Sequence, residues 1–355
     1  MIAKRQICKW LICSLLTSGL ILLAACSENS EEQMQGDRLQ LLTATRAGDA
    51  VTLTTAGASL RMYVASSSSD NPATAVFTLS DSWTATPPIS VREDTQYYIY
   101  GYMPDDEETV KADNVTVTAP DGGYADGINM TLASLPAVTG NDICLVVGVQ
   151  RVSDSDPRNE NRVCVPEELE EGQYRYFSGV AGSNYANLLL DHLYSQLVLH
   201  LNVGADYAKL RNIKLKELKL MAAETVTATV NIRSGSGITY PTYSGSGNKE
   251  WSLFSSDNGE ELKVSPEVTD LTALSGELYY APSIFNNKIT LRSTYDVYDR
   301  RGNLLRQDCT ATNEFSVPEM DHGVKKTLTL SVVPTYLYVL SDPDLDSPTL
   351  KVSSE

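Results

Sequence analysis

The segment Thr225-Val226-Thr227-Ala228-Thr229-Val230-Asn231-Ile232 decides the fold class, because its polar and apolar residues alternate strictly. Successive side chains of a β-strand point to opposite faces, so the alternation predicts a strand with one face in a core and one toward water. The same spacing recurs in Leu197, Leu199, Leu201 and Val203. We therefore expect a chain built from half-buried strands.

Further strand-like runs lie on both sides of this segment and are separated by turn residues. They cover residues 60–64, 75–79, 97–102, 115–118, 143–149, 277–281, 288–298, 304–310 and 326–333. Only residues 188–200 allow a helical turn to compete with a strand. Short strands at this spacing are typical of an antiparallel sandwich or barrel, so the sequence predicts an all-β protein.

Two local features refine this pattern. The apolar phase slips at Lys216-Glu217, which predicts a β-bulge. The turn at residues 299–303 predicts a hairpin between the runs 288–298 and 304–310. An acidic break at residues 167–172 and a small-residue loop at 179–183 predict a domain boundary before residue 184.

The N-terminus has the pattern of an export signal. Lys4, Arg5 and Lys9 precede an apolar run at residues 11–23, which is shorter than the roughly 20 apolar residues of a membrane-spanning helix. The run ends in Leu-Ala-Ala followed by Cys26, as in a bacterial lipobox. We expect Cys26 to be lipidated and to become the first residue after signal removal.

A removable segment is predicted after Cys26. Residues 27–36 are polar and acidic, as expected of a solvated tether. Leu39 and Leu41 then alternate with polar neighbours like a half-buried strand, and Arg46-Ala47 is a permissive site for a trypsin-like protease. One strand thus lies between a lipid anchor and a cleavable arginine.

Composition excludes several classes of function. The chain has 355 residues, enough for two domains, and a formal net charge of −17. Loss of the three basic residues of the signal shifts that charge to −20, which argues against nucleic acid and against anionic membrane surfaces as partners. Outside the signal and Cys26, three cysteines remain: Cys144, Cys164 and Cys309. Their spacing is not that of a zinc site, and isolated apolar cysteines are favoured over a Cys144–Cys164 bridge.

The sequence contains no recognisable catalytic motif. There are three histidines, His192, His200 and His322, and no Gly-x-Ser-x-Gly, P-loop or His-Glu-x-x-His pattern. The acidic residues at 342–346 lack the glycine and closing glutamate of a calcium loop. We therefore expect no enzyme activity, no cofactor and no metal.

Aromatic residues on both faces of the run 97–102 leave one alternative open. Tyr97, Tyr98, Tyr100 and Tyr102 would suit a carbohydrate-binding platform if they were exposed. Tyrosines packed inside a sandwich are the favoured interpretation.

Several motifs together carry a resemblance to a known family. They are the lipobox at 23–26, the cleavage segment at 43–47, Trp83 followed by residues 97–104, the segment 191–197, the hairpin strand at 295–299 and the tail after Gly323. Asp191-His192-Leu193-Tyr194-Ser195-Gln196-Leu197 is similar to the strand that opens the second domain of fimbrillin-like proteins. The chain thus resembles the fimbrillin family, lipoprotein precursors of type V pili in anaerobic gut and oral bacteria.

This resemblance implies two tandem transthyretin-like Greek-key β-sandwich domains and assembly by strand exchange. An outer-membrane lipoprotein precursor would be cut after Arg46 by an Arg-specific protease, and a strand of the next subunit would fill the groove left by the removed strand. The implied partners are the lipoprotein export machinery, other pilin subunits and a host or bacterial surface ligand. The mature form would lie in the fimbrium as a stalk or tip subunit.

The chain is accordingly divided into five segments. They are the signal peptide at 1–25, the lipidated tether and propeptide strand at 26–46, two β-sandwich domains at 47–183 and 184–333, and a C-terminal extension at 334–355. Candidate donor-strand residues in the extension are Tyr336, Leu337, Tyr338, Val339, Leu340, Leu350 and Val352. The same segment can instead be read as the last strand of the second domain.

Two other functions stay open at this point. One is a pilus anchor that is retained by the Cys26 lipid and never cut. The other is a surface glycan-binding lipoprotein.

Overall fold

The computed structural model describes residues 38–46, 57–66, 71–150, 177–178, 184–233, 237–256, 262–282, 288–316, 322–335 and 344–354. The regular structure in these ranges is almost entirely β, which confirms the all-β prediction. The helical exceptions there are a 3₁₀ turn (Ala112–Asn114), α2 (Ala205–Ala208) and α3 (Leu271–Ser275). Among the described residues, no helix has the length and apolar character needed to cross a membrane.

The strands up to residue 192 belong mainly to one lobe of the molecule. They are β1 (Leu39–Arg46), β2 (Ser59–Ser66), β3 (Ala73–Leu79), β4 (Trp83–Thr86), β5 (Gln96–Met103), β6 (Val115–Thr118), β7 (Gly127–Pro136), β8 (Val138–Thr139), β9 (Cys144–Gln150), β10 (Phe177–Ser178) and β11 (Asn184–His192).

The remaining strands build most of the other lobe. They are β12 (Ser195–Val203), β13 (Asn212–Ala222), β14 (Thr225–Arg233), β15 (Gly237–Ser246), β16 (Lys249–Ser255), β17 (Leu262–Val264), β18 (Thr269–Asp270), β19 (Tyr279–Tyr280), β20 (Lys288–Tyr298), β21 (Leu304–Ser316), β22 (Lys325–Thr335) and β23 (Asp344–Ser354).

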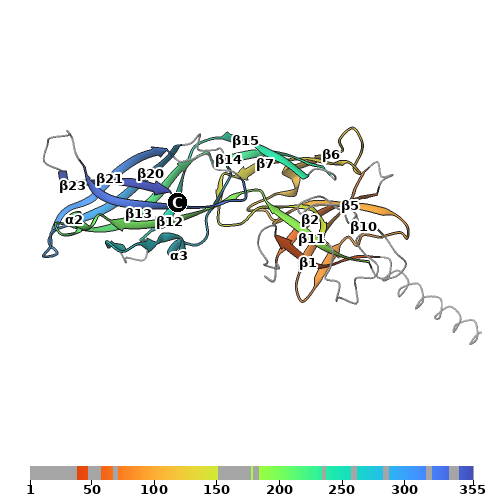
Figure 1. Ribbon diagram of the computed structural model, residues 1–355, viewed down its shortest axis with the longest axis horizontal. Helices are drawn as coiled ribbons and strands as arrows, with labels where there is room; N and C mark the ends of the chain where they lie inside the picture. The colour runs from red at the N-terminus through yellow and green to blue at the C-terminus, as the bar shows by residue number, and fades with distance from the viewer. Residues whose placement is uncertain are drawn as a thin grey trace, which may run out of the picture.

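Four sheets form an elongated molecule with a lobe at each end (Figure 1). The first lobe contains an eight-stranded sheet of order β1-β11-β9-β5-β2-β3-β4, with β10 on β5. In the second lobe, the sheet β23-β22-β12-β19-β8 packs against the sheet β16-β13-β20-β21. The fourth sheet, β15-β14-β7-β6, lies over the first lobe and reaches the junction between the lobes.

Strands from both sides of position 184 share these sheets. β11 follows the predicted boundary but pairs with β9 of the first lobe. β14 pairs with β7, and the short β8 pairs with β19 of the second lobe. The two lobes are therefore tied by backbone hydrogen bonds as well as by the connecting chain.

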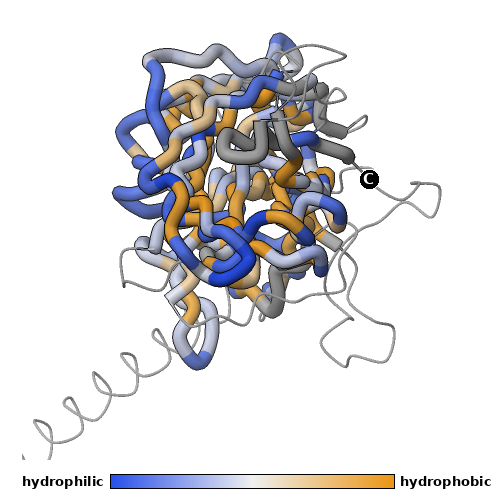
Figure 2. The backbone as a smooth tube through the Cα atoms, turned by 90° about the vertical axis from the view of Figure 1, so that its left-hand side faces the viewer, coloured by the Kyte–Doolittle hydropathy of each residue, from blue (hydrophilic) through white to orange (hydrophobic). Residues whose placement is uncertain are grey.

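Three apolar clusters form the core. One lies inside the curved eight-stranded sheet, a second between that sheet and β14-β7, and a third between the two sheets of the second lobe. Apolar stretches of the backbone lie toward the middle of the molecule and hydrophilic stretches gather at its rim (Figure 2). Strand β5 contributes to the first two clusters with its two faces, which explains why it has few polar residues.

Several predicted details are confirmed. The register of β13 against β20 shifts between Leu215 and Glu217, where the sequence predicts a bulge. β20 and β21 form the predicted hairpin. In β14, the four apolar residues Val226, Ala228, Val230 and Ile232 are buried.

The apolar stretch from 188 to 203, where the sequence allowed a helical turn to compete, is β in the structure. It forms two strands in different sheets, β11 and β12, separated by Leu193 and Tyr194. Leu193 donates its backbone N–H to the carbonyl of Ile143, and the Tyr194 hydroxyl donates to the carbonyl of Pro136, each at 2.8 Å. Both side chains are buried, so contacts with distant residues hold the chain at the break.

Candidate functional site

Strand β1 is the terminal strand of the eight-stranded sheet and lies between β11 and the segment at residues 89–90. On one side it pairs in parallel with β11, from Leu39 opposite Asn184 to Arg46 opposite Leu190. On its other side, the N–H of Leu39 donates to the carbonyl of Ile89 at 2.9 Å, and Arg38 forms a β-bridge with Ser90. The strand is thus paired along β11 on one side and, at its start, is held by the segment of Ile89 and Ser90 on the other.

The first half of β1 is part of the core. Leu39 is 3% exposed and Leu41 is 6% exposed, and both belong to the cluster that contains Ile89, Leu188 and Leu190. The predicted alternation of these two leucines with polar neighbours matches their inward direction. Removal of β1 would therefore uncover both an apolar floor and an unpaired strand edge.

The predicted cleavage site lies at the end of this strand. Arg46 is the last residue of β1. Ala47 and the predicted lipidation residue Cys26 lie outside the described residues. Cleavage after Arg46 and lipidation of Cys26 stay predictions.

The C-terminal extension contributes strand β23, which forms the edge of the second-lobe sheet. β23 pairs antiparallel with β22, with Leu350 opposite Val332 and Val352 opposite Leu330. The other candidate donor residues, Tyr336, Leu337, Tyr338, Val339 and Leu340, lie outside the described residues. In this structure the extension thus pairs with its own chain, and β23, at the edge of the sheet, has β22 as its one strand neighbour.

The tyrosines of β5 do not form an exposed platform. Tyr100 and Tyr102 are fully buried, and their hydroxyls donate to the Tyr124 carbonyl and to Asp105 Oδ1, each at 3.0 Å. The Tyr97 hydroxyl accepts the N–H of Arg92 at 2.8 Å, and Tyr98 is half-buried. Burial raises the pKa of both Tyr100 and Tyr102. The interpretation of these residues as core is confirmed.

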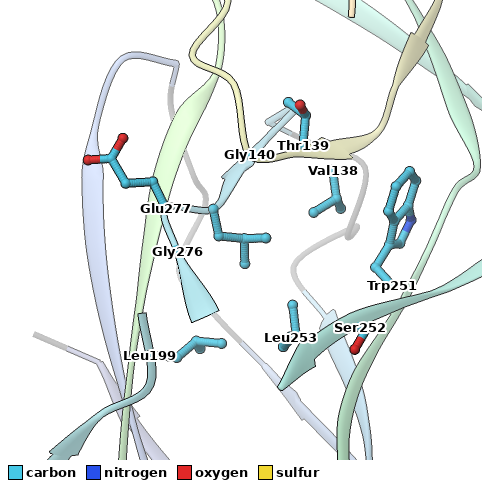
Figure 3. A pocket seen from close by; sticks show the side chains of 10 residues that line it. Val138, Thr139, Gly140, Leu199, Trp251, Ser252, Leu253, Gly276 and Glu277 are labelled. Atoms are coloured by element: carbon cyan, nitrogen blue, oxygen red, sulfur yellow. The ribbon is translucent and has the colours of Figure 1, made fainter. Parts of the chain in front are cut away.

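A cavity of about 230 Å³ lies near the junction in the second lobe. Val138, Leu253 and Trp251 point toward a common space, whereas the carboxylate of Glu277 points away from it (Figure 3). The Trp251 indole N–H donates to the Ala223 carbonyl at 3.1 Å, which leaves it no hydrogen to offer a ligand. The cavity is smaller than the roughly 300–1,000 Å³ typical of ligand pockets and lacks convergent polar groups.

Asp142, Cys144 and His192 form a cluster that motif spacing did not predict. His192, the last residue of β11, is directly opposite Cys144, the first residue of β9, and Asp142 lies two residues earlier. His192 Nδ1 is 2.9 Å from Asp142 Oδ2 and 3.7 Å from Cys144 Sγ. The register of β11 against β9 brings together residues that lie 48 and 50 positions apart in the sequence, and local spacing does not reveal such a register.

The chain is similar to known proteins in its three-dimensional structure but matches none of the compared proteins by sequence. No protein-family model matches the chain, and no curated protein matches it. A fimbrial protein from Bacteroides vulgatus matches with a TM-score of 0.51 and 14% sequence identity, over 90% of this chain and 98% of that protein. The chain has the fold of a fimbrial protein.

This fold agrees with the resemblance to the fimbrillin family, which is confirmed at that level. More distant matches are a protein assigned to cell adhesion from Bacteroides uniformis and the fimbrial anchor protein Mfa2 from Porphyromonas gingivalis. The first matches over 90% of this chain and 98% of its own length, with 14% identity and a TM-score of 0.44. The second matches over 90% of this chain and 96% of its own length, with 11% identity and a TM-score of 0.33. The tandem transthyretin-like Greek-key topology stays a prediction.

Proposed function

We propose that the chain is a structural subunit of a type V pilus, at a stalk or tip position, with a role in adhesion and without enzyme activity. It is exported as a lipoprotein on Cys26, displayed at the outer membrane, cut after Arg46 and polymerised by strand exchange. The observation that carries this proposal is β1, an edge strand that fills a core slot and ends at the predicted cleavage residue.

Loss of β1 gives a free-energy reason for polymerisation. Full burial of a leucine side chain contributes roughly 1.5–3 kcal/mol, so Leu39 and Leu41 together contribute about 3–6 kcal/mol. Cleavage would remove this contribution and leave the edge of β11 that faces away from β9 without a strand neighbour. An incoming extended segment would restore both, which is the physical basis of β-augmentation.

The C-terminal extension has a sequence suited to the vacated slot. Leu350 and Val352 have the same two-residue spacing as Leu39 and Leu41, so their side chains would project to one face of a strand. Residues 336–340 are all aliphatic or aromatic in the sequence. Release of β23 from the edge of β22 would make such a segment available to a neighbouring subunit.

The positions of the two strands suit a linear filament. β1 lies in the lobe at one end of the molecule and β23 in the lobe at the other end (Figure 1). A donor at one pole and an acceptor at the other give a heterologous, head-to-tail contact, which propagates into a filament when it does not close into a ring.

The pilus anchor is the second candidate, because β1 is in place in this structure. A subunit that keeps β1 and its lipid would have no vacant slot and would end a filament at the membrane. The glycan-binding alternative loses its supporting observation, since three of the four β5 tyrosines are buried.

One substitution with a matched control tests the proposal. Wild-type filaments sheared from cells should contain this chain with Ala47 as its N-terminus, identified by mass spectrometry. Arg46→Ala should leave a lipidated, monomeric, cell-bound precursor, whereas Arg38→Ala, directly before the first residue of β1, should be processed normally. Normal filaments from Arg46→Ala would overturn the proposal, and a wild-type chain that keeps Cys26 in the filament fraction would favour the anchor.

A further inference from the structure

We propose that Asp142, Cys144 and His192 bind a divalent transition-metal ion with the preferences of zinc. The three side chains supply one oxygen, one sulfur and one nitrogen, and these ligand atoms all lie within 4.8 Å of one another. The expectation of no metal came from cysteine spacing and from the absence of known metal-binding motifs, and neither detects ligands that strand pairing brings together.

The distances between the ligand atoms are close to those around a tetrahedral ion. Zinc binds nitrogen and oxygen at about 2.0–2.2 Å and sulfur at about 2.3 Å, so neighbouring ligand atoms stand roughly 3.3–3.8 Å apart. His192 Nδ1 lies 3.7 Å from Cys144 Sγ, and 2.9 and 3.1 Å from the two oxygens of Asp142. Small side-chain rotations would therefore admit an ion without a change in strand register.

The donor set favours zinc over hard cations. Calcium and magnesium prefer oxygen ligands, whereas zinc takes thiolate, imidazole and carboxylate together. The Cys144 thiol loses one proton when its sulfur binds the metal. Three protein ligands leave a fourth position, and His192, whose side chain is 17% exposed, lies on the side that water can reach.

The geometry does not suit a thiol-based catalytic triad. In such a triad, the carboxylate binds one imidazole nitrogen and the nucleophile faces the other. Here Asp142 and Cys144 both face Nδ1 of His192. A proton could not be relayed across the ring from the thiol to the carboxylate. The three ligand atoms instead converge on one point, as they would around a metal ion.

An ion at this site would link two strands at the junction of the lobes. Residues 193 and 194 follow His192 and lead directly into β12 of the second lobe. Gly323 also lies beside His192, since a Cβ placed on this glycine would be in ordinary contact with the Cβ of His192, at 3.6 Å. Metal binding would therefore hold β9 to β11 where the chain crosses from one lobe to the other.

The test uses the full chain, purified in detergent, with zinc and cobalt as probes. We expect about one zinc per chain after dialysis, and with cobalt a thiolate-to-metal charge-transfer band together with the visible bands of a tetrahedral ion. Cys144→Ala and His192→Gln should each weaken binding at least tenfold. Cys309→Ala and His200→Gln, which change residues outside the cluster, should bind as the wild type does.

Two results would overturn the proposal. One is a wild-type chain that binds no zinc above background or gives no thiolate band with cobalt, and this readout stands even if a cluster variant fails to fold. The other is a folded Cys144→Ala variant, checked by circular dichroism, that retains wild-type zinc affinity. In either case the cluster is an ordinary Asp–His ion pair beside a buried cysteine.

Discussion

Leu39 and Leu41 fix β1 in place because their side chains enter a core that is otherwise made by strands far away in sequence. Leu39→Ala or Leu41→Ala in the uncleaved chain should each lower the free energy of unfolding by about 2–5 kcal/mol, as large-to-small substitutions in cores do. Urea unfolding followed by fluorescence measures this loss. Gln40→Ala, a change at a half-buried position between them, is the control, and an equal loss from it would show that the leucines do not anchor the strand.

At the residue scale, the sequence identified the leucines of β1 but not the Asp142–Cys144–His192 cluster. Local alternation is sufficient to predict that Leu39 and Leu41 point the same way. The cluster depends instead on which residue of β9 stands opposite His192, and that register is set by pairing across the sheet. A search by cysteine spacing alone could not detect it.

At the scale of elements, the limits of strands with one polar face could be predicted from the sequence. The limits of strands that are buried on both faces could not. β14 alternates strictly, so its limits follow from the sequence. β11 places Leu188 and Leu190 in one core cluster and Leu189 in another, which removes the polar residues that would mark its end. The break before β12 comes from tertiary hydrogen bonds, and the parallel pairing of β1 with β11 has no local signal.

The bulge in β13 gives a prediction for the hairpin β20–β21. Asp296 is 2% exposed, accepts the N–H of Asp308 at 2.7 Å and lies 3.1 Å from Lys216 Nζ at the bulge. Asp296→Ala should lower the free energy of unfolding by about 1–3 kcal/mol, because it leaves a part-buried donor unpaired. Thermal or urea unfolding measures this.

Asp308→Asn provides the matched control for that change, because asparagine tolerates the left-handed backbone of this residue (φ 52°). Asp308 also pairs with Lys216, at 2.7 Å, but its side chain is 63% exposed. An exposed ion pair contributes about 0–1 kcal/mol, so this variant should stay close to the wild type. Equal losses from the two variants would mean that the bulge does not depend on the buried carboxylate.

At the scale of the whole molecule, the two lobes are joined by more than the chain that connects them. β14 and β15 of the second half extend the sheet of β7 and β6, and the core cluster between the sheets of the first lobe includes residues such as Val230 and Tyr279. Such shared sheets make relative motion of the lobes costly. A rigid subunit with assembly strands at opposite ends would transmit force along a filament with little internal bending.

The final prediction concerns the tail at this largest scale. β23 has one strand neighbour, β22, and the described core beneath β22 already draws on β12, β13 and β20. An uncleaved chain that ends at Val333 should therefore keep a single cooperative melting transition, while its processed form should fail to polymerise. Leu350→Asp with Val352→Asp should block polymerisation in the same way, whereas Lys351→Asp, at an exposed position between them, should not. Melting curves and gel analysis of unboiled polymers measure the two properties. If the truncated chain is unfolded or aggregated, the tail belongs to the core of its own subunit and the donor-strand proposal fails, because loss of several buried apolar side chains exceeds the roughly 5–15 kcal/mol stability of a domain.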